Sequence, residues 1–480
     1  MKYLLLTIGL FISIFLVAQK VYQPLSATSS SSAVLQAVNK RFQSDLTKLP
    51  KKHTKDFKEI YQKRYDNLVR NIKRGLYLED KTVHNYFNTI LQNIINANTD
   101  IPFRDIRLLI SRSAIPNASC IGEGTLVLNL GLITRLENES QIAFVICHEL
   151  AHYKRNHVNK AIRKHVNTMN SKKTQKELKR LSKLEFNKYE KGMALLKTLT
   201  YDSKRHSRLH EVEADSIGLF YMMKTSYDVS EAVRCLEILD EIDSDKYNYP
   251  TDLKKYFNAT EYPFKARWLK KETFITMDDS SNESEFNSDS LKTHPDCQKR
   301  IISVKRQLKG KSTGNRKKAL QSEQWLADFI LDSDYEIVER SYRSGNLGYC
   351  FYYTLQLLEL YPDDIYLNTI IGKCLNAYRL ARLNHEGSNY VPPASNDDSD
   401  DAYNQIVLFL NNLRTRDIAK LGYYFMANKN PKFLKEETFL YYLYLHAKAA
   451  KKIEQTQQLV AQYNQQFPEG KYKDEVKVPK

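Results

Sequence analysis

The chain has 480 residues, which is too long for one ordinary domain and suits roughly two or three. Hydrophobic residues make up 42% of it, which excludes a wholly disordered chain. The formal net charge of +17 would suit an anionic partner, but no nucleic-acid-binding motif accompanies it, so we expect no nucleic-acid partner.

The first 18 residues have the layout of a secretory signal peptide. Lys2 precedes an uncharged, mostly apolar run from Tyr3 to Val17, and Ala18 is a suitable cleavage position. The run is shorter than the about 20 residues that a membrane-spanning helix needs, although an uncleaved anchor is the alternative interpretation. We therefore expect an exported protein, periplasmic or secreted, and membrane-peripheral at most.

Residues 19–49 combine a serine-rich linker with a first helix, whose periodic pattern begins near Val34. The segments 105–110 and 124–133 are rich in apolar and β-branched residues and predict strands. Between them, the stretch PNASCIGEG contains Gly122 and Gly124, where another backbone can approach closely. A plain loop is the alternative interpretation of this stretch.

The stretch VICHELAHYKRNH, residues 145–157, lies in a predicted helix that starts at a capping-box pattern formed by Asn138 and Gln141. His148 and His152 are four residues apart, so both imidazoles lie on one face and can bind one metal ion. Glu149 lies about 100° round the helix and can take a proton from a water molecule activated there. An ordinary helix with hydrogen-bonded histidines is disfavoured, because the surrounding residues are apolar.

A catalytic zinc site needs a third protein ligand. A metzincin would place a histidine where this chain has Val158, and would place a glycine at Arg155, so we interpret His157 as a surface histidine. Glu211 is the better candidate, because it lies on a separate predicted helix. Asp215 follows four residues later and can accept the second N–H group of a ligand histidine.

The same predicted helix carries Ala214 and Gly218, two small residues four positions apart. Their spacing favours a close approach to the helix that carries the histidines. The six cysteines include no C-x-x-C pair, which excludes a zinc ribbon, and they are too sparse for a disulfide scaffold. Their spacing does not indicate which of them would pair in an oxidising compartment.

From about residue 320 the pattern is helical and rich in tyrosine and leucine. Two helical segments end at Pro362 and Pro468, which resembles tetratricopeptide-type (TPR) repeats. The period is irregular, because the stretch HEGSNYVPPASNDDSDD interrupts it, and a generic helical domain is the alternative. We predict a TPR-like helical domain over residues 320–480.

Four stretches together resemble the M48 metallopeptidases: PNASCIGEG, CHELAHYKRNH, RLHEVEADSIGL and THPDCQKRI. The resemblance covers residues 50–310. It implies a gluzincin-type domain, α+β but mostly α, with a small β-sheet. It also implies one Zn²⁺ per chain on His148, His152 and Glu211, Glu149 as general base, and Asp215 as support for a ligand histidine.

The resemblance assigns three further residues. Gly122 and Gly124 would belong to the edge strand that binds the substrate backbone. His294, in the THP stretch, would either stabilise the oxyanion or occupy the open coordination position until substrate displaces it; a plain loop histidine is the alternative. The acidic, serine-rich segment 278–290 precedes it and is predicted to be a mobile loop.

The chain lacks the transmembrane helices of the CAAX-processing and HtpX-like branches, so it is more similar to the periplasmic M48 proteases of cell-envelope quality control. We therefore predict a zinc endopeptidase for misfolded or stalled envelope proteins, with assembly partners bound through the C-terminal helices. The alternative is a TPR-based chaperone or assembly scaffold whose metal site is idle or gated.

Overall fold

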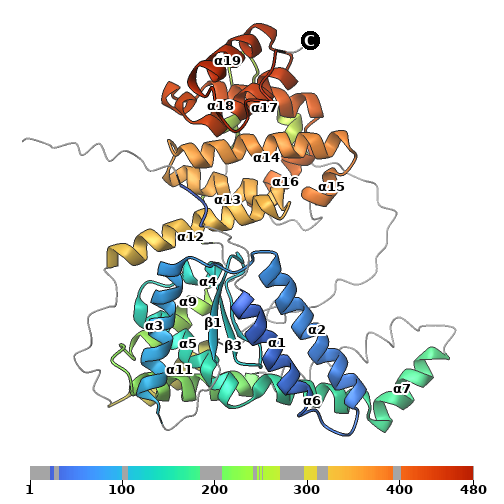
Figure 1. Ribbon diagram of the computed structural model, residues 1–480, viewed down its shortest axis with the longest axis vertical. Helices are drawn as coiled ribbons and strands as arrows, with labels where there is room; N and C mark the ends of the chain where they lie inside the picture. The colour runs from blue at the N-terminus through green and yellow to red at the C-terminus, as the bar shows by residue number, and fades with distance from the viewer. Residues whose placement is uncertain are drawn as a thin grey trace, which may run out of the picture. The chain divides into compact units, whose positions relative to one another are not determined.

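The structure is a computed structural model (Figure 1). It describes residues 22–25, 32–99, 106–183, 208–241, 246–247, 249–250, 252–270, 297–310, 323–392 and 402–478. The predicted signal peptide, the segment 278–290 and His294 lie outside these ranges. The described part is mostly α-helical with one small sheet, which confirms the predicted fold class.

The chain divides into two compact units. The first, here the site unit, comprises Pro24–Asn248 and Lys271–Asn346. The second, here the helical unit, comprises Met1–Gln23, Tyr249–Lys270 and Leu347–Lys480. The sequence predicted one boundary between residues 310 and 320. The helical unit instead also includes Tyr249–Lys270, and its C-terminal part begins at Leu347.

Aromatic packing and a buried ion pair explain the division. In the helical unit, the ring of Phe257 packs against the rings of Phe351 and Phe409. In the site unit, Arg112 donates a hydrogen bond of 2.8 Å to Glu336, a residue of α12 (Glu323–Arg343).

The site unit contains a three-stranded sheet in the order β1-β3-β2. Its strands are β1 (Arg107–Ser111), β2 (Ala118–Cys120) and β3 (Thr125–Asn129), with β1 parallel and β2 antiparallel to β3. The second predicted strand is thus shorter than expected, because α4 (Leu130–Ile133) begins directly after Asn129. Gly131 permits this turn: a Cβ atom there would lie 2.0 Å from the carbonyl oxygen of Ala114.

Helices cover both faces of the sheet (Figure 1). On one face, Val127 packs with residues of α1 (Ser32–Leu46) and α2 (Thr54–Lys73). Leu126 and Leu128 point to the other face, because side chains alternate along a strand, and both are fully buried. On that face lie α3 (Lys81–Ala97) and α5 (Glu139–Lys154). The sheet therefore holds α5 firmly on one side.

Helix α5 is the central helix of the site unit. Every residue from Gln141 to Ala151 is buried. The helix starts as predicted, with the Asn138 side chain accepting a hydrogen bond of 3.1 Å from the Gln141 amide. The Gln141 side chain in turn accepts one of 2.8 Å from the Glu137 amide. These two reciprocal hydrogen bonds fix the residue at which the helix begins.

Further helices surround α5: α6 (His157–Met169), α7 (Lys172–Ser182), the helical residues 208–223, α9 (Glu231–Asp240) and α11 (Cys297–Leu308). The predicted close approach of two helices is confirmed. A Cβ atom on Gly218 would lie 3.0 Å from the Cα atom of His148, and Ala214 is fully buried. Residues 208–223 therefore pack backbone to backbone against α5.

The helical unit contains α10 (Leu253–Phe257), η1 (Ala266–Leu269), α13 (Leu347–Leu360), α14 (Ile365–Leu383), α15 (Gly387–Tyr390), α16 (Ala402–Asn412), α17 (Thr415–Ala427), η3 (Pro431–Lys435), α18 (Glu437–Ala449) and α19 (Ile453–Gln466). Successive long helices pack on one another, as α13 does on α14 and α18 on α19. The TPR period remains a prediction. Within the described ranges, none of the helices combines the length and apolarity needed to cross a membrane.

The buried imidazole of His446 predicts a pH dependence of stability. The ring is fully buried and its Nε2 atom donates a hydrogen bond of 2.9 Å to the carbonyl oxygen of Gly372. Burial lowers the pKa of His446 from 6.5 to about 4. The neutral ring therefore contributes stability that is complete above pH 6.5 and is lost as the pH falls towards 4.

We expect the difference in unfolding free energy between wild type and His446→Gln to shrink by about 2–3 kcal/mol between pH 7 and pH 4.5. Urea unfolding followed by circular dichroism measures it. The exposed His385 provides the control, because His385→Gln should show no such change. An equal difference at both pH values would contradict the assignment of a neutral buried ring.

Candidate metal centre

Three side chains from two helical segments converge in the site unit. Helix α5 supplies His148 and His152, whose Nε2 atoms are 3.0 Å apart. Residues 208–223 supply Glu211, whose carboxylate oxygens lie 3.5 Å from His148 Nε2 and 3.4 Å from His152 Nε2. Ligand atoms bonded to a tetrahedral zinc at about 2.0–2.1 Å lie roughly 3.3 Å from one another. The three predicted ligands therefore fit a zinc ion.

His148 is oriented by an ion pair behind it. Its Nδ1 atom lies 3.0 Å from a carboxylate oxygen of Asp215, on the same helical segment as Glu211. Arg300, from α11, donates two hydrogen bonds of 2.6 and 2.7 Å to the Asp215 oxygens. Arg300 and Asp215 are each only 1% exposed. Asp215 thus lies where it can hold the Nδ1 atom, which directs Nε2 towards the metal position.

The charges in this cluster change the protonation of His148. Burial works against a charged ring, but the hydrogen bonds with Asp215 and Glu211 outweigh it and raise the pKa of His148 to about 10. Burial also opposes a charged Asp215, but Arg300 outweighs it and lowers the Asp215 pKa to about 2. A proton and a divalent cation therefore compete for His148 Nε2.

The interpretation of His157 as a surface histidine is wrong. The side chain is 3% exposed, and its Nδ1 atom lies 2.9 Å from the Nδ1 atom of His152. The cause is a sharp turn, in which Asn156 has a φ of 57° between the end of α5 and the start of α6. This turn directs the His157 ring back towards His152, near the C-terminal end of α5.

His157 also connects His152 to a carboxylate. Its Nε2 atom lies 2.9 Å from an oxygen of Glu213, and that carboxylate accepts a second hydrogen bond of 2.6 Å from Arg155. Burial outweighs the Glu213 hydrogen bond and lowers the pKa of His157 to about 4, so its ring is neutral. We assign the two hydrogen bonds so that His152 Nδ1 donates to His157 Nδ1, and His157 Nε2 donates to the Glu213 carboxylate. This tautomer leaves the lone pair of His152 Nε2 for a metal.

Glu149 lies beside the cluster. Its side chain is 3% exposed and lines a cavity of about 20 Å³ together with His148, Arg300 and Ala118 of β2. A volume of roughly this size holds one water molecule. A carboxylate, a candidate metal ligand and the outer strand of the sheet therefore share one small space.

The two predicted substrate-binding glycines lie in the turn between β2 and β3. Their φ angles are 91° for Gly122 and 102° for Gly124, a conformation that favours glycine. A Cβ atom on Gly122 would also lie 2.8 Å from the Val158 side chain. These constraints explain both glycines without a substrate, and their binding role stays a prediction. His294 lies outside the described residues, three positions before α11 begins.

Sequence reasoning assigned no role to Arg300, and one signal could have found it. Helix α11 buries Cys297, Arg300, Ile301 and Val304. These positions have the i, i+3, i+4, i+7 spacing of a buried helical face, so an arginine among them must have a buried partner. For His157 and Glu213 the sequence offers no comparable signal, because their contact depends on the turn at Asn156.

Residues 81–308 match the family model of peptidase family M48. This range contains both helical segments of the metal cluster, the sheet and all of α11. No curated protein matches the chain.

The contact between His157 and His152 predicts an effect on metal affinity. His157→Ala removes the acceptor that fixes the His152 ring, so we expect zinc affinity to fall by roughly 10–100-fold. Competition with a chromophoric chelator measures it. His165, exposed on the same helix, gives the control His165→Ala, which should change the affinity less than about twofold. Equal affinities of the two variants would refute the positioning role.

The buried ion pair predicts an effect on stability. Arg300→Leu leaves the Asp215 charge buried without its main partner, which should lower the unfolding free energy of the metal-free chain by about 3–5 kcal/mol. Arg306→Leu, at an exposed position of the same helix, should change it by less than about 0.5 kcal/mol. Urea unfolding compares the two. Similar losses in both variants would show that the ion pair does not stabilise the site unit.

Proposed function

We propose, because residues 81–308 match the family model of peptidase family M48, that this protein is a zinc-dependent endopeptidase acting on misfolded or stalled cell-envelope proteins. The observation that carries the proposal is the convergence of His148, His152 and Glu211 beside the buried carboxylate of Glu149. A set of three metal ligands, one of which shares a cavity with a carboxylate base, is what metal-assisted hydrolysis requires.

Each residue has a role that follows from its position. Zinc bound here would act as a Lewis acid, which would polarise the carbonyl group of the substrate and make a bound water molecule more acidic. Glu149 accepts a proton from the attacking water and can pass it to the leaving amine. Arg300 and Asp215 hold His148, and His157 with Glu213 holds His152, so both imidazoles keep their Nε2 atoms aimed at one point.

The sheet suggests the form of the substrate. In the described part of the chain, β2 pairs with β3 on one side and with no strand on the other, and Ala118 of β2 lines the cavity beside Glu149. An extended backbone that adds to this edge would place a peptide bond near the base. Only an unfolded segment can adopt that form, which supports misfolded or stalled proteins as substrates.

The predicted signal peptide supports action outside the cytoplasm, in the periplasm or after secretion. We keep His294 as a candidate for stabilising the oxyanion or for gating the metal, because it precedes α11, the helix that brings Arg300 to the site. Partners of the C-terminal helices in envelope assembly remain part of the proposal.

The variant Glu149→Gln tests the proposed mechanism. It removes the base but none of the metal ligands, so we expect about one zinc per chain and a loss of casein cleavage by about 10²–10⁴-fold. Elemental analysis and a cleavage assay, with and without a chelator, measure both. Glu177→Gln on α7 is the control and should cleave as the wild type does. Unchanged cleavage by Glu149→Gln would sink the mechanism, whereas a wild type that binds clients without cleaving them would favour the chaperone alternative.

A further inference from the structure

The helical unit contains two cysteines, and the fold brings them together. Cys350 lies in α13 and Cys374 lies in α14, and their Sγ atoms are 3.3 Å apart. The other four cysteines of the chain belong to the site unit. Within the helical unit there is therefore one possible intramolecular pair, which the spacing of the six cysteines in the sequence does not show.

The hairpin formed by α13 and α14 explains the contact. A short connection, residues 361–364, joins the two helices, which lie side by side (Figure 1). Pro362 lies in this connection, 12 positions after Cys350 and 12 positions before Cys374. Each helix rises by the same amount per residue, so the two cysteines lie at the same level of an antiparallel hairpin. The backbone arrangement therefore sets the pairing.

The distance between the two sulfur atoms suits a disulfide bond. The bond is about 2.0 Å long, so the atoms must approach by roughly 1.2 Å, which small rotations of both side chains can supply. A metal ion is the alternative bridge between two thiols. Among the residues that the structure describes, however, the group of three side chains able to hold an ion is the His148 cluster. The two sulfur atoms thus lack the further protein ligands that a metal site needs.

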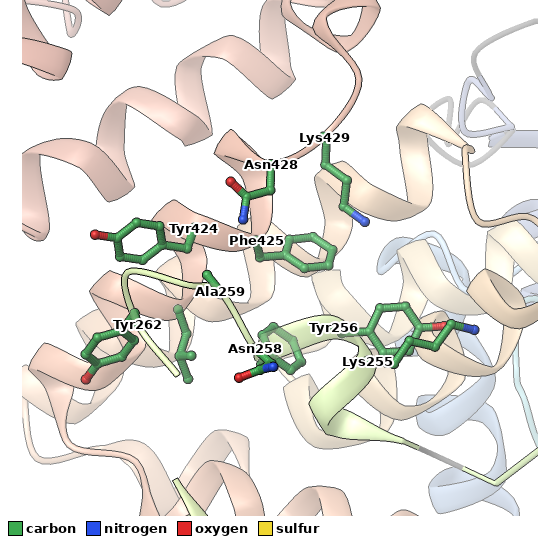
Figure 2. A pocket seen from close by; sticks show the side chains of 11 residues that line it. Lys255, Tyr256, Asn258, Ala259, Tyr262, Tyr424, Phe425, Asn428 and Lys429 are labelled. Carbon is green, nitrogen blue, oxygen red and sulfur yellow. The ribbon is translucent and has the colours of Figure 1, made fainter. Parts of the chain in front are cut away.

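Both thiols are shielded from solvent. Cys350 is 0% exposed and Cys374 is 2% exposed. A cavity of about 230 Å³ lies in the same unit, between α17 and the segment that contains α10 (Figure 2), but neither cysteine lines it. A reductant dissolved in water therefore reaches the sulfur atoms only when the hairpin opens. This burial favours a permanent cross-link over a redox switch, because regulatory disulfides are exposed.

We propose that Cys350 and Cys374 form a structural disulfide when the chain folds in an oxidising compartment. The oxidant is itself a disulfide, either of a small thiol such as glutathione or of a protein. One cysteine thiolate attacks it to form a mixed disulfide, and the second thiolate then attacks the cysteine sulfur of that bond. Two electrons pass to the oxidant, which leaves as two thiols that carry the two cysteine protons.

The disulfide stabilises the centre of the helical unit. Helix α14 packs against α17 and α18, and α13 packs against α16. Phe351, beside Cys350, stacks on the ring of Phe257 in α10. The bond restricts the unfolded chain and so favours the folded hairpin on which these helices pack. This inference goes beyond the proposed peptidase function and does not depend on it; it rests on the predicted export, because thiols stay reduced in the cytoplasm.

Peptide mapping tests the pairing. The full chain is produced in cells with an oxidising cytoplasm, so that the result does not depend on export. Free thiols are alkylated, and the chain is digested with trypsin without reductant. We expect peptides 344–373 and 374–379, which contain one cysteine each, to be joined. Alkylation of both cysteines, or a bond from either to a cysteine of the site unit, would overturn the proposal.

Urea unfolding tests the structural role. The bond closes a loop of about 25 residues, so we expect dithiothreitol to lower the urea midpoint of the wild type by about 1 M in circular dichroism. The double variant Cys350→Ala, Cys374→Ala should show the same midpoint with and without the reductant. Cys147→Ala removes an equally buried cysteine of the site unit and should keep the wild-type response. A response of the double variant as large as that of the wild type would contradict the assignment.

The rate of reduction separates a structural bond from a switch. Because the sulfur atoms are buried, dithiothreitol should reduce the bond in the folded wild type at least about 100-fold more slowly than in urea. Alkylation at timed intervals, followed by the same peptide mapping, measures both rates. Similar rates would show that the bond is open to exchange in the folded chain, and would refute the structural role.

Discussion

The ion pair between Arg300 and Asp215 is the contact on which the candidate metal centre depends. Three helical segments meet there. Arg300 belongs to α11, Asp215 belongs to residues 208–223, and His148, which Asp215 orients, belongs to α5. Burying two charges is costly unless their hydrogen bonds are satisfied. Here both Asp215 oxygens accept from the guanidinium, and one also faces His148. The ion pair therefore ties the packing of three helices to the direction of one ligand atom.

The two imidazoles have different supports. His148 faces a buried, fully charged carboxylate, whereas His152 reaches Glu213 through the neutral ring of His157. Glu213 is about one third exposed and also pairs with Arg155 at the surface. The support of His148 therefore lies in the core, whereas the support of His152 extends to the protein surface at Glu213.

The sequence predicted what short helical spacing determines. His148, His152 and Glu149 follow from positions on one helix, and Asp215 follows from its spacing to Glu211. The contacts of Arg300 and His157 arise only when α11 packs and when the chain turns at Asn156, so local patterns could not reveal them. The same holds for the end of β3, where the approach of Gly131 to Ala114 decides the turn. Likewise, the aromatic contacts of Phe257 decide that its segment packs in the helical unit.

We propose that two turns of α5 and one carboxylate from residues 208–223 bind a single zinc ion. The most direct test is a crystal structure of the zinc-loaded chain, with the metal located by its anomalous scattering. We expect one zinc bonded to the Nε2 atoms of His148 and His152 and to Glu211, at about 2.0–2.2 Å. Zinc bound elsewhere, or a Glu211 carboxylate beyond bonding distance, would contradict it.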